Sequence, residues 1–225
     1  MSRSRVLAFD VNETLLDVGA LDPLFAEVFG AASWRRVWFG QMLQLAMLGG
    51  LTGAYADFSS CQGAALEMVA AQAEVQLPPG TAERLLDGMR ALPPHDDVAE
   101  ALDALAGAGF RVMALTNSPL PVVQEQLRRA ALSDRFELIA SADQVGALKP
   151  APAPYQMAAR AAGVPVGRLR LVAAHGWDVS GALAAGCAAA FLVRSPAVPN
   201  PLGPQPDVTG VGLAEVARGI IAHDA

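Results

Sequence analysis

Five short apolar runs are spaced along the chain, and each is bounded by polar or turn-forming residues. They are rich in β-branched side chains and have the length of buried strands. Between and beside them lie segments whose apolar residues recur with helical spacing. Strands that alternate with helices in this way predict βαβ units and a parallel sheet with right-handed crossovers. The predicted strands are residues 6–9, 111–115, 136–140, 169–173 and 188–193, and the helices predicted around them are residues 96–108, 121–131, 153–162, 179–185 and 213–223.

Residues 15–94 break this alternation, because their apolar residues keep helical spacing throughout and form no strand-like run. Glycine and proline pairs divide the segment at Gly49-Gly50 and at Pro78-Pro79, and Pro93-Pro94 forms a hinge at its end. We therefore expect a Rossmann-like, doubly wound α/β core domain of residues 1–14 and 95–225. The helical cap domain, residues 15–94, is inserted after the first strand. The helices expected in the cap are residues 21–29, 34–48, 54–73 and 81–89, and residues 196–206 are expected to form a proline-rich surface loop.

The composition narrows the class of partner. The 225 residues are 53% hydrophobic and 17% charged, which is enough apolar material for a sizeable core. A net charge of −6 argues against nucleic acid as a partner, since phosphate binding needs a basic face. No apolar run is long enough to span a bilayer, and the apolar stretch after the basic N-terminus is too short for a secretory signal. Two cysteines, Cys61 and Cys187, suit a reducing compartment, so we expect a cytoplasmic protein with two buried thiols.

Lysine occurs once in the chain. Of the 16 basic residues only Lys149 is a lysine, so arginine supplies the ordinary surface cations. A single ammonium group on this background suggests a position that a planar guanidinium would not fit. Lys149 is therefore a candidate site residue.

Polar residues capable of chemistry follow the predicted strands at four places. Because ligands of parallel α/β sheets bind beyond the carboxyl ends of the strands, these side chains should surround one crevice. The set contains two carboxylates, an ammonium, an imidazole, hydroxyls and amides. Its members are Asp10, Asn12 and Thr14 after the first strand, Thr116 and Asn117 after the second, Lys149 and Tyr155 after the third, and His175, Trp177 and Asp178 after the fourth.

This order of motifs resembles the haloacid dehalogenase superfamily over essentially the whole chain, including a helical cap after the first strand. The resemblance implies that Asp10 is the nucleophile. Many members are phosphatases, which carry an aspartate two residues after the nucleophile and bind magnesium through the nucleophile and acids of the fourth motif. Here that second aspartate is replaced by Asn12, which has no titratable proton to transfer to a leaving group. Asp178 is the one acid of the fourth motif, which leaves few carboxylates for a hard divalent cation, so we expect no metal and no cofactor.

The 2-haloacid dehalogenase branch of the superfamily fits these motifs better, because a halide leaves without a proton. The resemblance implies that Asp10 attacks the carbon bearing the halogen and forms an ester, and that Lys149 keeps Asp10 ionised. It also implies that Thr14 orients the nucleophile and that Asp178 activates water. The expected partner is a small halogenated carboxylic acid. The candidate residues for binding substrate or halide are Asn12, Phe39, Thr116, Asn117, Tyr155 and Trp177.

The chain departs from that branch at three positions. Phe39 stands where the branch has a cap arginine, and Ala173 and His175 stand where it has a serine and an asparagine. His175 precedes Asp178 by three residues, which suggests that it is a further catalytic residue, the base for water, with Asp178 orienting it.

Several interpretations stay open. Arg35 and Arg36 lie about one helical turn before Phe39, and we favour a solvated cap surface for both over a role in the site. The apolar residues of segment 39–48 surround the predicted helix, which predicts a homodimer. The alternative functions are a magnesium-dependent phosphatase of a small phosphate ester and a non-catalytic binding protein of the same fold.

Overall fold

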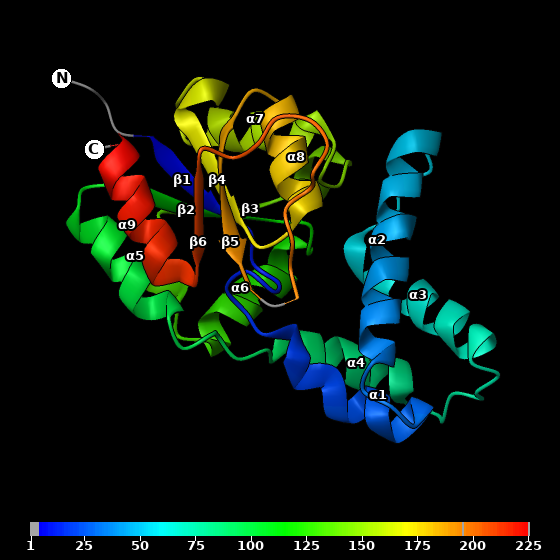
Figure 1. Ribbon diagram of the computed structural model, residues 1–225. Coiled ribbons are helices and arrows are strands. Elements are labelled where there is room, and N and C mark those ends of the chain that lie inside the picture. The colour runs from blue at the N-terminus through cyan, green and yellow to red at the C-terminus, as the bar shows by residue number, and fades with distance from the viewer. Residues whose placement is uncertain (1–4, 195, 225) are drawn as a thin grey trace.

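A single parallel sheet forms the centre of the protein. The computed structural model describes residues 5–194 and 196–224, and in this part of the chain six strands pair in the order β3-β2-β1-β4-β5-β6. The order changes direction between β1 and β4, which are neighbours in the sheet (Figure 1). Ligands of such sheets bind beyond the carboxyl ends of the strands at this point. The strands are β1 (Val6–Phe9), β2 (Arg111–Thr116), β3 (Leu138–Ser141), β4 (Leu169–Ala173), β5 (Ala188–Val193) and β6 (Val208–Val211).

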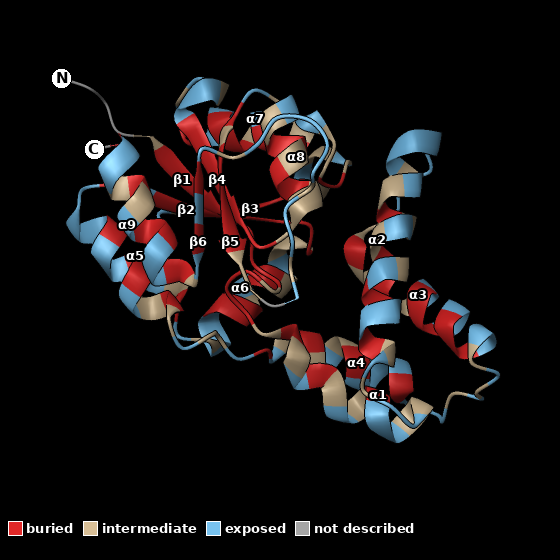
Figure 2. Ribbon diagram, viewed as in Figure 1, coloured by how far each residue is buried: buried red, intermediate tan, exposed pale blue. Residues whose placement is uncertain are grey.

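Helices cover both faces of the sheet. Successive strand residues point to opposite faces, which divides the core in two. Leu7 and Phe9 belong to a cluster with α5 (Val98–Gly107), α6 (Leu120–Arg129) and α9 (Leu213–Asp224). Val6 and Ala8 belong to a second cluster with α7 (Pro152–Ala161) and α8 (Gly176–Ala184). The predicted doubly wound α/β core is confirmed, and its strands are mostly buried (Figure 2).

The segment between β1 and α5 is helical and stands beside the sheet (Figure 1). Its helices α2 and α3 pack together, and the indole Nε1 of Trp38 donates to the carbonyl oxygen of Gln62 at 3.0 Å. The chain leaves and re-enters the core side by side, since Asp17 N donates to Pro93 O at 2.8 Å and His95 N to Leu15 O at 2.9 Å. The division into a core domain and a cap domain of residues 15–94 stays a prediction. The helices are α1 (Asp22–Phe29), α2 (Trp34–Thr52), α3 (Phe58–Gln72) and α4 (Thr81–Arg90).

The largest differences from the sequence-based expectation are in α2, α3 and β6. The predicted break at Gly49-Gly50 is wrong, because α2 continues to Thr52 and ends where Gly53 adopts a left-handed φ of 72°. Helix α3 begins at Phe58 and not at residue 54, because the side chain of Asp57 accepts a hydrogen bond from Ser60 N and caps the helix. Strand β6 was not predicted.

The remaining surface expectations have mixed outcomes. Cys61 and Cys187 are buried free thiols, as predicted. None of the helices in residues 5–194 and 196–224 combines the length and apolar character that a membrane crossing requires. Leu48 and Leu51 near the end of α2 are exposed, and the homodimer stays a prediction.

Candidate active site

Asp10 follows β1 directly and is held from several sides. Its Oδ1 accepts a hydrogen bond from Lys149 Nζ at 2.9 Å, and its Oδ2 accepts one from Thr14 Oγ1 at 2.8 Å. The Nδ1 atom of His175 lies 3.0 Å from the same Oδ2. Burial alone would raise the pKa of Asp10, but the positive charges of Lys149 and His175 outweigh burial and hold the pKa well below its usual range. Asp10 is thus a buried, ionised carboxylate.

Lys149 lies between two carboxylates. Its fully buried Nζ donates to Asp10 Oδ1, to Asp178 Oδ2 at 2.5 Å and to Leu115 O at 2.9 Å. Burial would lower the pKa of Lys149, but the two carboxylates raise it above its ordinary value. Three acceptors around one nitrogen match the three donors of an ammonium group, which explains why this position holds the one lysine of the chain.

Asp178, at the start of α8, is held by donors on both oxygens. Tyr155 OH donates to Asp178 Oδ1 at 2.6 Å, and Lys149 Nζ donates to Oδ2. Burial raises the pKa of Asp178, although Lys149 acts in the opposite direction. Tyr155 is buried behind Asp178 and lines neither pocket described below, so its predicted contact with substrate is not supported. Its position indicates that it orients Asp178.

Close packing keeps α8 in this position. A Cβ on Gly181 would lie 2.5 Å from Pro150 Cβ and 2.6 Å from Tyr155 OH. We expect Gly181→Ala to lower the free energy of unfolding by about 1–3 kcal/mol and to reduce activity, because α8 would move away from Lys149 and Tyr155. Urea denaturation with an activity assay measures both effects. Gly107→Ala is the matched control, since no atom lies within 4 Å of its added Cβ. Equal stability of the two variants would contradict this packing argument.

Both asparagine side chains of the site form hydrogen bonds with neighbouring residues. Asn117 accepts from Lys149 N at 2.7 Å and donates to Lys149 O at 3.2 Å, so it fixes the lysine backbone. Asn12 donates to Ser118 Oγ at 3.2 Å and accepts from Gln126 Nε2 at 3.0 Å. Both asparagines nevertheless line the pocket beside Asp10. A side-chain amide in the place of Asn12 offers no acidic proton.

His175 is stacked between two aromatic rings. Its ring centroid is 5.6 Å from that of Phe39 and 5.3 Å from that of Trp177, with interplanar angles of 18° and 28°. Its Nε2 lies 3.2 Å from Glu13 Oε2. Burial would lower the pKa of His175, but Asp10 and Glu13 raise it to about 9. At neutral pH the ring is therefore an imidazolium, which is the wrong form for a base.

The expected pairing of His175 with Asp178 is thus wrong. The ring nitrogens of His175 face Asp10 and Glu13, while the oxygens of Asp178 face Lys149 and Tyr155. The sequence spacing suggested the pair, but α8 directs Asp178 to the opposite side of Lys149.

Glu13 and Arg35 are site residues that the sequence analysis missed. Arg35 is buried, and its Nη1 donates to Glu13 Oε1 at 3.0 Å while its Nε donates to Asp22 Oδ1 at 2.5 Å. The solvated surface favoured for Arg35 is therefore wrong, whereas Arg36 is exposed as expected. One signal could have identified Glu13. Glu13 is a charged residue between the motif residues Asn12 and Thr14. Its loop adjoins the loop that carries His175.

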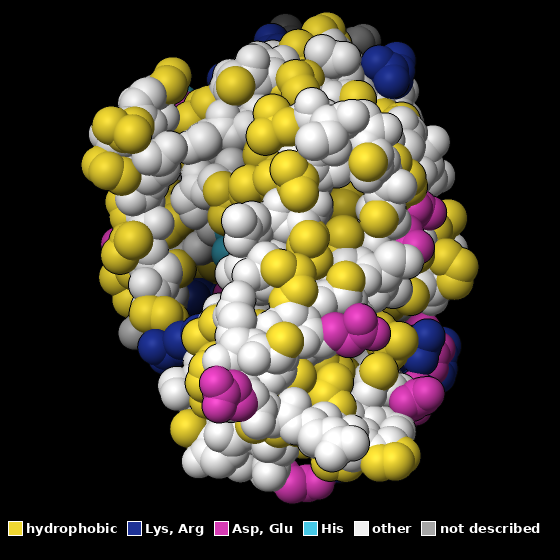
Figure 3. Space-filling view, turned by 90° about the vertical axis from the view of Figure 1, so that its right-hand side faces the viewer, with side chains coloured by type: hydrophobic (Ala, Val, Ile, Leu, Met, Phe, Trp, Pro, Cys, Tyr) yellow, Lys and Arg dark blue, Asp and Glu magenta, His cyan; other side chains and the backbone are white. Residues whose placement is uncertain are grey.

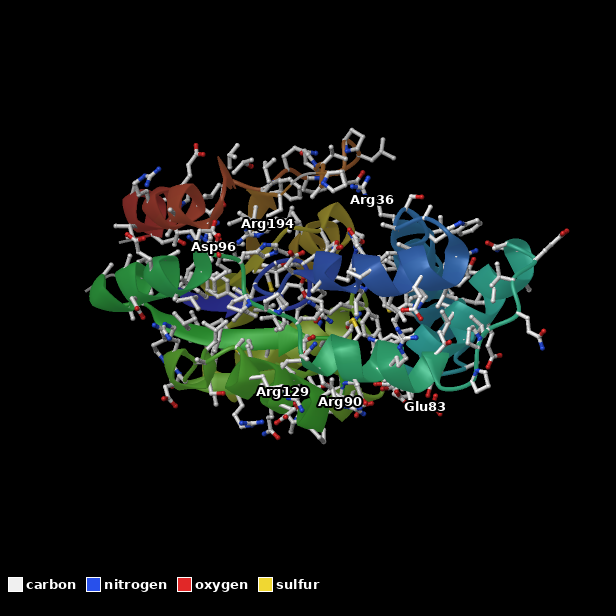
Figure 4. The ribbon with its side chains drawn as sticks, turned by 90° about the horizontal axis from the view of Figure 1, so that it is seen from below. Arg36, Glu83, Arg90, Asp96, Arg129 and Arg194 are labelled. Atoms are coloured by element: carbon white, nitrogen blue, oxygen red, sulfur yellow. The ribbon has the colours of Figure 1, made fainter. Side chains whose placement is uncertain are left out.

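Two cavities meet at the aromatic stack. The outer cleft has a volume of about 410 Å³, and the space-filling view shows a hollow between the helical lobe and the body of the protein (Figure 3). Arg36 and Arg194 both line this cleft and lie on the same side of the molecule (Figure 4). The inner pocket has a volume of about 10 Å³, close to that of one water molecule. The inner pocket is lined by Asp10, Asn12, Phe39, Leu43, Phe58, Thr116, Asn117, Lys149, His175 and Trp177.

The donor set does not fit a divalent metal ion. Within residues 5–194 and 196–224 no group of three or more His, Cys, Asp or Glu side chains is arranged to hold one. The ammonium of Lys149 lies between Asp10 and Asp178 and pairs with both carboxylates, so neither is free to bind a metal ion.

Comparison with known proteins agrees with this geometry. The profile of the haloacid dehalogenase-like hydrolases matches residues 5–186. Haloacetate dehalogenase H-2 of Moraxella sp. (strain B) is 30% identical over 211 residues, which cover 93% of this chain and 94% of that protein. The solved L-2-haloacid dehalogenase of Xanthobacter autotrophicus shares the fold, with a TM-score of 0.91 at 23% identity, over 99% of this chain and 100% of that one. A dehalogenase solved with an intermediate complex superposes with a TM-score of 0.88 at 27% identity, over 96% of each chain.

Proposed function

The chain belongs to the haloacid dehalogenase-like hydrolase family, and from this premise we propose that it is a metal-independent dehalogenase of small 2-haloalkanoic acids. The observation that carries the proposal is the ammonium of Lys149 between Asp10 and Asp178, 2.9 Å and 2.5 Å from their oxygens. It keeps the nucleophile ionised in a desolvated pocket and neutralises both carboxylates without a metal ion. The relative named above as a haloacetate dehalogenase supports the same reaction.

In the first half of the proposed reaction, a carboxylate oxygen of Asp10 attacks the carbon that bears the halogen. The new carbon–oxygen bond forms as the carbon–halogen bond breaks, and the halide leaves with the bonding electrons, so no proton is required. Thr14 holds the attacking group in place, because its hydroxyl donates to Asp10 and accepts from Ala174 N at 3.0 Å. Phe39, Thr116, Asn117 and Trp177 line the space for the substrate.

In the second half, water attacks the carbonyl carbon of the Asp10 ester. Asp178 is the proposed base, and the rise in its pKa on burial favours acceptance of a proton. Collapse of the tetrahedral adduct breaks the bond between the Asp10 carboxyl carbon and the substrate oxygen, and the departing alkoxide takes the proton from Asp178 to give a 2-hydroxy acid. The Asp10 carboxyl group then loses its proton. Overall, water and the haloacid give the hydroxy acid, a halide and one proton, and Asp10 regains its charge.

The size of the inner pocket favours the smallest substrates. With a volume of about 10 Å³ it must widen for any ligand, and the stacked rings of Phe39, His175 and Trp177 close its side toward the cleft. We therefore place haloacetates before longer 2-haloacids as substrates, in keeping with the name of the Moraxella relative.

Halide release tests the proposal. We expect ion chromatography to detect halide from bromoacetate and chloroacetate in the presence of EDTA, with slower release from 2-chloropropionate. A single turnover in ¹⁸O-labelled water should give an unlabelled hydroxy acid, because its oxygen comes from Asp10, and should place the label in the protein. Labelled product in the first turnover would show direct attack by water and would contradict the ester. Release that required magnesium, or turnover of an aryl phosphate instead, would favour the phosphatase alternative.

A further inference from the structure

The charge of the inner pocket poses a problem for an anionic substrate. Apart from His175, the charged side chains that line this pocket are Asp10 and Lys149, and the ammonium of Lys149 is already paired with Asp10 and with Asp178. A 2-haloacid brings a carboxylate and releases a second anion, and a pocket whose one lysine is already paired with carboxylates offers neither of them a counter-charge. Among the described residues that line this pocket, His175 is the one remaining group that can carry a positive charge.

Resting on the proposed function, we propose that His175, as an imidazolium, supplies the positive charge that attracts the anionic groups of substrate and product to the inner pocket. Glu13 is then the positioning residue that holds this ring in place and keeps it charged.

The hydrogen-bond geometry of the His175 ring by itself indicates that the ring is protonated. Nδ1 lies 3.0 Å from Asp10 Oδ2, and Nε2 lies 3.2 Å from Glu13 Oε2. Both carboxylates are ionised acceptors, so both nitrogens must donate, and a neutral imidazole has one N–H only. The faces of Phe39 and Trp177 on either side of the ring favour a cation further.

Glu13 is fixed by its own backbone and by helix α2. Its φ of 61° is unusual for a residue with a side chain, and such conformations persist where the surroundings require them. Its second oxygen, Oε1, accepts from Arg35 Nη1, and Arg35 is anchored to Asp22. One carboxylate therefore connects the ring of His175 to α2, and it has no freedom to swing away from Nε2.

The ionisation of His175 depends on the charges around it. Asp10 and Glu13 contact the ring, Lys149 lies across Asp10, and Arg35 lies behind Glu13. The pKa of His175 is raised to about 9, above its ordinary value of 6.5, so the charge is complete at neutral pH and is lost as the pH rises through about 9. A binding role therefore predicts that activity falls on the alkaline side. The other charged or titratable groups that share pockets with the ring are Asp17, Arg36, His95 and Arg194.

Glu13→Gln tests the proposal without altering any atom that contacts the nucleophile. The chain has three histidines, so imidazole NMR signals can be assigned with His175→Gln and titrated. Removal of one adjacent negative charge should lower the pKa of His175 by about 1 or more, with Glu13→Asp restoring part of it. Chloride binding, measured by the line width of chloride NMR at pH 8, should weaken several-fold, and the alkaline limb of the activity profile should move to lower pH. Glu74→Gln is the matched control, because Glu74 is an exposed glutamate with a similar φ of 54°.

Two results would overturn the proposal. One is an unchanged titration of His175 in Glu13→Gln, and the other is activity that falls on the acid side through the pKa of His175, as for a base. The NMR titration and chloride binding need no turnover. Failure of the proposed function is recognised separately, as the absence of halide release from every haloacid by the unmodified protein.

Discussion

Replacement of Lys149 by methionine is expected to lower the free energy of unfolding by about 3–5 kcal/mol at pH 7 and to abolish turnover. The methionine would fill much of the same volume but would leave Asp10 and Asp178 as two buried carboxylates without a counter-charge. One of them would have to take up a proton, so the pKa of the pair would rise and the nucleophile would be neutralised.

The pH dependence of this loss has a definite sign. In the unmodified protein the depressed pKa of Asp10 stabilises the fold above the pKa of the unfolded chain, and this contribution is lost as the pH falls. In Lys149→Met the raised carboxylate pKa destabilises the fold at high pH and ceases to do so on acidification. The difference between the two proteins should therefore shrink as the pH falls from 7 toward about 4. Urea unfolding at several pH values measures it, with Arg218→Met as an exposed control. A deficit that is constant with pH would indicate lost packing instead.

Asp10→Asn is expected to remove halide release by at least about 10⁴-fold while the protein stays folded. The amide has the shape of the carboxylate but is not a nucleophile, and Lys149 keeps its contacts with Asp178 and Leu115. The same substitution should lower the pKa of His175, because the charge of Asp10 is one of its causes.

Halide release, thermal unfolding and the imidazole titration together check this prediction. Asp134→Asn removes an exposed carboxylate and serves as the control for the loss of one charge. Residual turnover within a factor of ten of the unmodified protein would show that water, and not Asp10, attacks the substrate.

The core of the fold could be predicted because β1, β2, β4 and β5 are largely apolar runs that the sheet buries. Strand β6 could not, because it is a four-residue edge strand in which buried and exposed residues alternate, and it contains Gly210. The continuation of α2 through Gly49 was missed for a different reason. The carbonyl oxygen of Ala54 approaches this residue so closely that a Cβ would lie 2.9 Å away, so glycine marks a chain contact here and not a helix end.

The candidate site, like the fold, could be predicted from the sequence only in part. Asp10, Lys149 and Asp178 could be placed together because they follow strands whose carboxyl ends meet at one edge of the sheet. The partners of His175 could not, because they depend on which side of the lysine each side chain faces. Arg35 reaches the site only through the packing of α2 against the loop after β1, a tertiary contact that helical spacing does not encode.

The narrow crossing between core and helices has a consequence for the movement of ligands. The backbone pairs Asp17–Pro93 and His95–Leu15 tie the two linking segments to each other, so any swing of α1–α4 must pivot at this one place. Because the inner pocket holds little more than a water molecule, it must widen for substrate to enter and for product to leave, and such a swing would widen it. The swing would separate Phe39 from His175 and Arg35 from Glu13. Opening and closing on the microsecond to millisecond scale, more than the chemistry at Asp10, would then set the pace of turnover.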